Sequence, residues 1–134
     1  MAMTVEEKRI IKRLCDTGKW DERSAIVGIR AKFKCEYCGK DLLKNIFNYK
    51  EWQLDHIIPL ASGGQDDLEN IALSCRFCNV VLKRRWNIKK DTTIKLPPRP
   101  NRMDLIKAVA KHLKQVKKEK EKELDILRNI INAE

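Results

Sequence analysis

The chain has 134 residues, of which 43% are apolar and 36% are charged, and its formal net charge is +10. This size and composition fit one folded domain with appended helices, in which a bound metal would support a modest core. Because no apolar run approaches the roughly 20 residues of a transmembrane helix and no apolar signal core follows Met1, we expect a cytoplasmic protein without a membrane partner.

Two amphipathic helices are predicted in residues 1–34. The first begins with a capping box formed by Thr4 and Glu7, and the second follows an N-cap at Asp21. Cys15 lies on the first helix among apolar residues. We therefore interpret Cys15 as a small core residue and not as a nucleophile.

Four of the five cysteines form two C-x2-C pairs that are separated by 36 residues: Cys35, Cys38, Cys75 and Cys78. Two such pairs are typical of one tetrahedral zinc site, with each thiolate about 2.3 Å from the metal. Two disulfides are the alternative, and a reducing compartment disfavours them. Four thiolates leave no open position on the metal, so this zinc is predicted to be structural.

A strand followed by a loop is predicted where an acid and an imidazole are adjacent in the sequence. Residues 51–60 alternate between apolar and polar types and contain Asp55 followed by His56. Neighbouring side chains on a strand point to opposite faces, so these two side chains diverge. The two adjacent glycines of the following loop are expected to supply positive φ angles. A second short strand in residues 71–75 and a helix then follow.

Positive charge is concentrated in residues 76–100, which hold eight basic residues and one acidic residue. A solvated basic face is one interpretation of such a run, and a polyanionic partner such as nucleic acid is the sharper one. Sequence-independent contacts with phosphates are predicted for five side chains: Lys83, Arg84, Arg85, Lys89 and Lys90. Trp86 could stack on a base, but we interpret it as an aromatic anchor in the core.

A stiff proline-rich linker in residues 91–100 precedes one long helix in residues 101–134. The apolar residues of this helix repeat at alternating spacings of three and four, in a heptad seam that two lysines interrupt. The helix is longer than the core domain, so it either packs over residues 4–33 of its own chain or pairs with a second copy in a homodimer. His112 is interpreted as a surface residue of the helix.

The order of motifs in residues 35–83 closely resembles that of the HNH nuclease superfamily in its zinc-bound, four-cysteine form. The pattern is C-x2-C, D-H-x2-P, G-G, N and C-x2-C-N-x3-K. The resemblance implies an α+β fold in which a small zinc-stapled ββα-metal core occupies residues 35–90. The N-terminal helices in residues 1–34 and the long C-terminal helix would flank this core.

The resemblance also implies a role for each motif residue in the hydrolysis of a phosphodiester. His56 matches the general base, a task for which an imidazole is suited. Asp55 and Asn79 match ligands of a catalytic cation, and their oxygen atoms favour Mg²⁺ or Mn²⁺. Asn70 matches the central asparagine, whose amide holds the loop beneath the histidine. The structural alternatives are a buried ion pair for Asp55, a helix N-cap for Asn79 and a simple turn for Asn70.

A metal-dependent endonuclease acting on DNA is the function that the sequence favours, and RNA is left open as a substrate. The main alternative is a non-catalytic zinc-knuckle module that binds nucleic acid, which would not need Asp55, His56 and Asn79 together. A zinc deaminase would need the motifs H-x-E and P-C-x-x-C, and neither occurs in the chain. A toxin or effector nuclease would use the same HNH motif.

Overall fold

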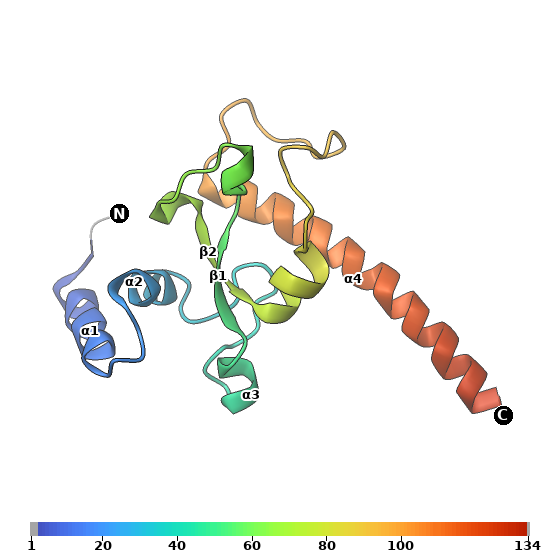
Figure 1. Ribbon diagram of the computed structural model, residues 1–134, viewed down its shortest axis with the longest axis horizontal. Helices are drawn as coiled ribbons and strands as arrows, with labels where there is room; N and C mark the ends of the chain where they lie inside the picture. Colours follow the sequence, from blue (N-terminus) through green and yellow to red (C-terminus); the bar gives the residue numbers. More distant parts are fainter. Residues whose placement is uncertain (1–2, 134) are drawn as a thin grey trace.

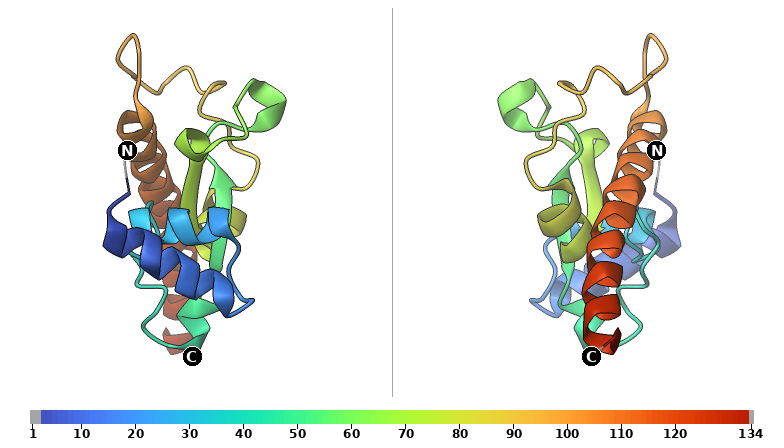
Figure 2. Two further views of the ribbon diagram at one scale, coloured as in Figure 1. Left: turned by 90° about the vertical axis from the view of Figure 1, so that its left-hand side faces the viewer. Right: turned by 90° about the vertical axis from the view of Figure 1, so that its right-hand side faces the viewer.

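The computed structural model describes residues 3–133 and has an α+β fold (Figure 1). A two-stranded antiparallel sheet lies in the middle of the body, with helices α1 and α2 at one end. The long helix α4 passes one side of the sheet and continues beyond the body, away from α1 (Figures 1 and 2). The expected combination of N-terminal helices, a small sheet and a long C-terminal helix is confirmed.

Local capping signals define the starts of both N-terminal helices. At the start of α1 (Val5–Asp16), the Thr4 side chain accepts the backbone N–H of Glu7, and the Glu7 side chain accepts that of Thr4, at 3.0 Å each. Helix α2 (Glu22–Arg30) follows Asp21, whose carboxylate accepts a backbone N–H of the first turn at 2.7 Å. This backbone hydrogen bond lowers the pKa of Asp21.

The sheet pairs β1 (Trp52–His56) with β2 (Ile71–Cys75), in a register that runs from Trp52 opposite Cys75 to His56 opposite Ile71. Every residue of β2 is buried, whereas each residue of β1 is partly exposed. The strand β2 is therefore the inner strand. The register also places the acid and imidazole at one end of the sheet and Cys75 at the other.

Three short helical turns lie in the connections: α3 (Ile46–Tyr49), η1 (Leu60–Ser62) and η2 (Leu68–Asn70). The sequence does not predict α3, because four residues are too few to show a helical periodicity. After β2 the chain enters η3 (Phe77–Lys83), a π-helix at the place where a helix is predicted. Its wider winding is evident from the hydrogen bond between the Arg84 N–H and the Asn79 carbonyl, at 2.9 Å.

Aromatic packing fastens the N-terminal helices to the sheet. Trp20, between α1 and α2, stacks on Trp52 of β1 with ring centroids 4.3 Å apart and an interplanar angle of 13°. Phe33 meets the Trp20 ring edge-on at 5.3 Å. Val27 of α2 also belongs to the same buried cluster as Leu73 of β2. The segment before the first cysteine pair therefore shares one core with the sheet.

Helix α4 (Arg102–Ala133) has two halves in different surroundings. Its first half buries four apolar side chains: Leu105, Ile106, Val109 and Leu113. The principal neighbour of α4 among the named elements is η3, and not residues 4–33 as the intrachain alternative expected. Arg102 also donates a hydrogen bond to the Ile71 carbonyl at 2.9 Å. The start of α4 is thus attached to the start of β2.

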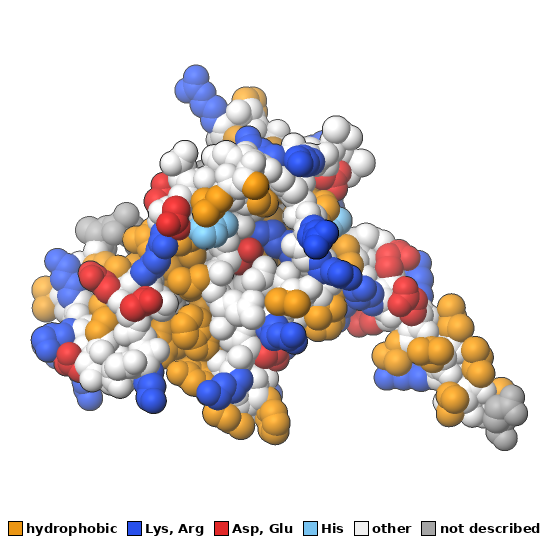
Figure 3. All heavy atoms as spheres, viewed as in Figure 1, with side chains coloured by type: hydrophobic (Ala, Val, Ile, Leu, Met, Phe, Trp, Pro, Cys, Tyr) orange, Lys and Arg blue, Asp and Glu red, His pale blue; other side chains and the backbone are white. Residues whose placement is uncertain are grey.

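The second half of α4 projects from the body with its apolar side chains exposed: Leu124, Ile126, Leu127, Ile130 and Ile131. Figure 3 shows these hydrophobic side chains gathered toward the free end of the helix. We call this set the distal apolar face. Among residues 3–133, no helix is both long enough and apolar enough to cross a membrane. Charged residues interrupt α4, the longest of these helices.

Candidate metal centre and active site

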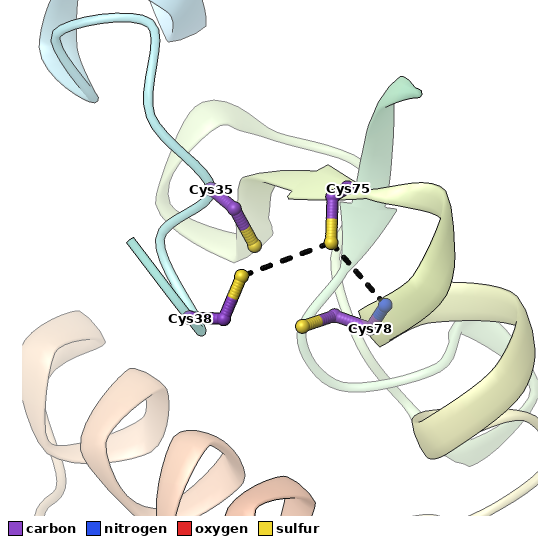
Figure 4. A group of neighbouring side chains, drawn as sticks. All are labelled: Cys35, Cys38, Cys75 and Cys78. Carbon is purple, nitrogen blue, oxygen red and sulfur yellow. Dashed lines mark hydrogen bonds between the residues drawn. The ribbon is translucent and has the colours of Figure 1, made fainter. Parts of the chain in front are cut away.

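Four thiols converge from three elements of the fold (Figure 4). Cys35 and Cys38 precede β1, Cys75 ends β2 and Cys78 lies in η3. Their Sγ atoms all lie within 4.8 Å of one another, and those of Cys38 and Cys75 are 3.8 Å apart. About 3.8 Å is also the edge of a tetrahedron of sulfurs around zinc at Zn–S distances of about 2.3 Å. All five cysteines are free thiols, so the donor set fits zinc and the disulfide alternative does not hold.

The thiols perturb one another's proton affinity. Hydrogen bonding from Cys38, and then from Cys75 and Cys78, lowers the pKa of Cys35 far below that of an ordinary thiol. Cys35 in turn acts to raise the pKa of Cys38, but Cys75 and Cys78 outweigh it and lower that pKa to about 7. The pKa values of Cys75 and Cys78 are raised, chiefly by Cys35. The cluster therefore favours a thiolate and must release protons when it binds a cation.

At the other end of β1, Asp55 faces η3 and forms a buried ion pair. The Lys83 Nζ atom lies 2.5 Å from Asp55 Oδ2, and it also donates to the carbonyls of His56 at 2.9 Å and Ile57 at 3.3 Å. The Tyr37 hydroxyl donates to the same Oδ2 at 2.6 Å. The exposed fractions are 4% for the Lys83 side chain and 11% for Asp55. This burial contradicts the phosphate contact predicted for Lys83, because its ammonium group is directed into the fold.

Asn79 lies on the same side of η3 as Lys83 and also faces β1. Its Nδ2 donates to Gln53 Oε1 at 2.8 Å. Gln53 and Asp55 are two residues apart on the strand, so they share a face. Asn79 is the third residue of η3 and is not its N-cap, so the capping alternative is wrong. The structure thus brings Asp55 and Asn79 onto the facing surfaces of β1 and η3.

His56 points away from this face and contacts the loop that joins the two strands. Its Nε2 lies 2.8 Å from Oδ1 of Asp66, and Nη2 of Arg23 donates to the same oxygen at 2.9 Å. The hydrogen bond with His56, followed by that from Arg23, lowers the pKa of Asp66. Asp66 is a residue that sequence reasoning missed. Its only sequence signal is a carboxylate within a glycine-rich loop, which is common in solvated turns.

The Asn70 side chain holds this loop in place. Its Oδ1 accepts the Ile58 N–H at 2.8 Å, and its Nδ2 donates to the carbonyls of Ile58 and Gln65, both at 2.8 Å. Gly63 has a φ of +89°, as predicted for the glycine pair, but Gly64 does not share it. Gly64 is instead required by space, since a Cβ there would lie 2.0 Å from the Ile58 carbonyl oxygen. The buried amide makes Asn70 more than a simple turn residue.

Residues 35–85 match the model of the HNH endonuclease family. We refer to this matched segment as the HNH domain. The matched range includes the four-thiol cluster, both strands and η3, together with Asp55, His56, Asn70 and Asn79. Neither the curated proteins nor the solved structures compared with the chain gave a match. The similarity to a nuclease-type family therefore rests on this segment alone, and α1, α2 and α4 lie outside it.

Four of the five basic residues predicted to contact phosphates are exposed, at the end of the HNH domain and just beyond it: Arg84, Arg85, Lys89 and Lys90. We call these four residues the basic surface. Within residues 3–133, none of the four forms a salt bridge with a carboxylate. Their charges are therefore available to a polyanion, unlike that of Lys83.

Two predictions for residues around the HNH domain need correction. His112 is partly buried and stacks on Trp86, with centroids 3.9 Å apart, so it is a packing residue and not simply a surface residue. Desolvation lowers the pKa of His112. Cys15 is only partly buried, and α1 has no fully buried residue, so Cys15 is not the core residue that the sequence predicts. Trp86 packs against the core, and its Nε1 donates to Asp91 at 2.9 Å, as an aromatic anchor would.

Proposed function

We propose that this protein is a metal-dependent HNH endonuclease that hydrolyses phosphodiester bonds of DNA. One observation carries the proposal within the HNH domain. The side chains of Asp55 and His56, at the end of β1, point toward different partners: that of Asp55 toward η3 and that of His56 toward the loop between the strands. In-line displacement at phosphorus needs a base on the attacking side and positive charge on the leaving side. Two diverging neighbours on a strand are suited to serve the two sides.

His56 is the proposed general base. Its side chain is 34% exposed, so water reaches it. The imidazole would take a proton from the attacking water as the new bond to phosphorus forms and the bond to the leaving sugar oxygen breaks. A positioned base of this kind contributes about 10²–10⁴ to the rate.

Asp55 and Asn79 are the residues that would hold a divalent cation. Oδ2 of Asp55 and Nδ2 of Asn79 are already engaged in hydrogen bonds with other protein groups. The second oxygen of the carboxylate and the amide oxygen are hard ligands that suit Mg²⁺ or Mn²⁺. When bound, such a cation stabilises negative charge on the leaving oxygen. The four-cysteine cluster would hold a structural zinc, which ties Cys78 of η3, and hence its neighbour Asn79, to the sheet.

The basic surface follows η3 directly and would bind the phosphate backbone without reading sequence. DNA is the proposed substrate, and RNA is the other polyanion that the same charges would hold. Comparing the two in one cleavage assay decides between them.

We also propose that the distal apolar face of α4 pairs with a second copy of the chain. Five exposed apolar side chains on one projecting helix are difficult to account for in a monomer. Glu119, Lys120 and Glu123 lie on α4 just before this face, and would allow oppositely charged contacts between two helices. A homodimer would present two active sites, as the cutting of both DNA strands requires.

The buried ion pair favours a second candidate function, a zinc-knuckle module that binds nucleic acid without cutting it. In such a module Asp55 would serve only as the partner of Lys83. His56 would then have no chemical task. The two functions differ in what happens to a plasmid: a nuclease cuts it and loses that activity without His56, whereas a binding module leaves it intact in either case.

The deciding experiment compares plasmid cleavage by the parent protein, His56→Ala, Asp55→Ala and Asn79→Ala in Mg²⁺, Mn²⁺ and EDTA. We expect His56→Ala to keep its fold, its zinc and its DNA affinity while cleavage falls by about 10²–10⁴. Excess Mn²⁺ should partly restore Asp55→Ala and Asn79→Ala, which weaken the cation site, and should not restore His56→Ala. Fixed fragment ends would indicate a site-specific enzyme, and a smear a nonspecific one.

His112→Ala is the matched control, since it removes the chain's other histidine outside the proposed site. It should cut at close to the parent rate. A folded, zinc-loaded parent protein that binds DNA without cutting it would favour the binding module instead. A His56→Ala protein that cuts as fast as the parent would mean that His56 is not the base.

A further inference from the structure

We propose that Asp66 is a positioning residue for His56, and that Arg23 of α2 holds Asp66 in place. The inference rests on the proposed function, in which His56 is the base, and extends it to residues outside the expected motif. The contacts are His56 Nε2 to Asp66 Oδ1 at 2.8 Å and Arg23 Nη2 to the same oxygen at 2.9 Å. Arg23 also donates to the Asp66 carbonyl oxygen at 2.9 Å.

The contact with Asp66 decides which ring nitrogen of His56 can act as a base. An ionised carboxylate can only accept hydrogen bonds, so Nε2 of His56 carries the proton in this contact. The lone pair of the neutral ring is then on Nδ1, which is the atom that would accept a proton from water. After that transfer both ring nitrogens carry protons, and the Asp66 carboxylate stabilises the resulting imidazolium. Asp66 would therefore set both the tautomer and the orientation of the base.

The position of Asp66 depends on contacts from two directions. Within the loop, the Asn70 amide binds the Gln65 carbonyl, directly before Asp66, at 2.8 Å. From outside the loop, Arg30 of α2 donates to the carbonyl of Leu68 at 2.7 Å and to that of Ile71. Arg23 and Arg30 thus bind the loop from the same helix. Helix α2 lies outside the segment that matches the HNH family, so the catalytic unit would extend beyond that segment.

A simple surface salt bridge is the structural alternative, and it predicts a different result. The exposed fractions are 34% for the His56 side chain and 58% for Asp66. Exposed ion pairs contribute little to stability, so removing Asp66 should leave the unfolding transition almost unchanged in either case. A positioning role predicts a loss of kcat in addition, whereas a surface salt bridge predicts no change in kcat.

The first test measures kcat and KM for plasmid cleavage by Asp66→Ala, Asp66→Glu and Arg23→Ala. We expect Asp66→Ala to lower kcat by about tenfold to a hundredfold with KM unchanged, since a carboxylate that orients a base acts on the chemical step. Asp66→Glu should recover part of that loss, and Arg23→Ala should lower kcat by a smaller factor. Glu69→Gln is the matched control, because it removes one negative charge from the same loop without a hydrogen bond to His56. Its kcat should equal that of the parent.

The second test is independent of cleavage and uses ¹H–¹⁵N spectra of the His56 imidazole. In the parent protein we expect a hydrogen-bonded Nε2–H resonance that Asp66→Ala removes or shifts strongly and that Glu69→Gln leaves in place. If the parent protein cuts no nucleic acid, the proposed function fails while these spectra still decide whether Asp66 holds the ring. An Asp66→Ala protein with the parent kcat, or with an unchanged Nε2–H resonance, overturns the inference.

Discussion

The ammonium group of Lys83 lies 2.5 Å from a carboxylate oxygen of Asp55, although the two residues are 28 positions apart in the chain. The pair joins η3 to the end of β1, and Asp55 is also one of the two proposed ligands of the cation. Both side chains are largely buried, so each charge depends on the other. The lysine of the N-x3-K motif therefore lies within the fold, where it is not exposed to contact a phosphate.

Replacing Lys83 by methionine should destabilise the folded protein by about 3–5 kcal/mol, because Asp55 is left as a buried charge without its partner. Urea unfolding of the zinc-loaded protein measures this change. The double variant Asp55→Ala/Lys83→Met is the control, and it should be more stable than Lys83→Met alone because no buried charge remains. Equal unfolding midpoints for the parent and Lys83→Met would mean that the ion pair contributes nothing to stability.

Replacing Cys38 by serine should abolish zinc binding and, with it, folding. Cys38 is the exposed member of the cluster, so little core packing is lost and the effect would come from the metal. Elemental analysis should find one zinc per parent chain, and circular dichroism should show loss of structure in the variant. Cys15→Ser is the control and should retain both zinc and fold. A folded parent protein without zinc would contradict the assignment of the cluster.

Zinc affinity should fall as the pH falls. Zinc binds thiolates. The pKa of Cys35 is lowered, whereas the pKa values of Cys75 and Cys78 are raised. Cys75 and Cys78 must therefore lose protons to bind zinc, so protons compete with the metal. Competition with a chelator of known affinity, repeated across a pH series, measures the dependence. An affinity that does not change with pH would mean that the thiols do not bind the metal.

Replacing all four residues of the basic surface by alanine should weaken DNA binding for every sequence and reduce the slope of log affinity against log salt. Each phosphate contact contributes roughly 0.9 to that slope on duplex DNA. Fluorescence anisotropy at several salt concentrations gives both quantities. A variant with four alanines at Lys111, Lys118, Lys122 and Arg128 of α4 removes the same charge elsewhere. If both variants show the same slope, the basic surface is only solvated.

Two lysines introduced at Leu124 and Leu127 should convert a dimer into a monomer without loss of zinc, since they place charge within the distal apolar face. Light scattering measures the mass in solution. The matched control introduces lysines at Asn129 and Asn132, which lie on the opposite side of α4 and add the same charge. A parent protein that is already monomeric at high concentration would show that this face pairs with no second copy.

Local signals in the sequence were sufficient for the features that depend on neighbouring residues. The capping box at Thr4 and Glu7 and the N-cap at Asp21 act within one helical turn, so their residue types predict the starts of α1 and α2. The spacing of the two C-x2-C pairs likewise predicts the four-thiol cluster. The two cysteines of each pair are three positions apart, and the four sulfur atoms lie within 4.8 Å of one another, as the ligands of one zinc would.

Only the tertiary structure decided which partners the charged and aromatic side chains have across the chain. Asp66 lies ten positions from His56, and Arg23 lies 43 positions from Asp66, so no short pattern connects them. The π-helix directs Lys83 inward to Asp55, although its basic neighbours had suggested a phosphate contact. The path of α4 likewise places His112 on Trp86. Sequence periodicity specifies the face of an element on which a residue lies, whereas the packing of elements against one another determines what that face meets.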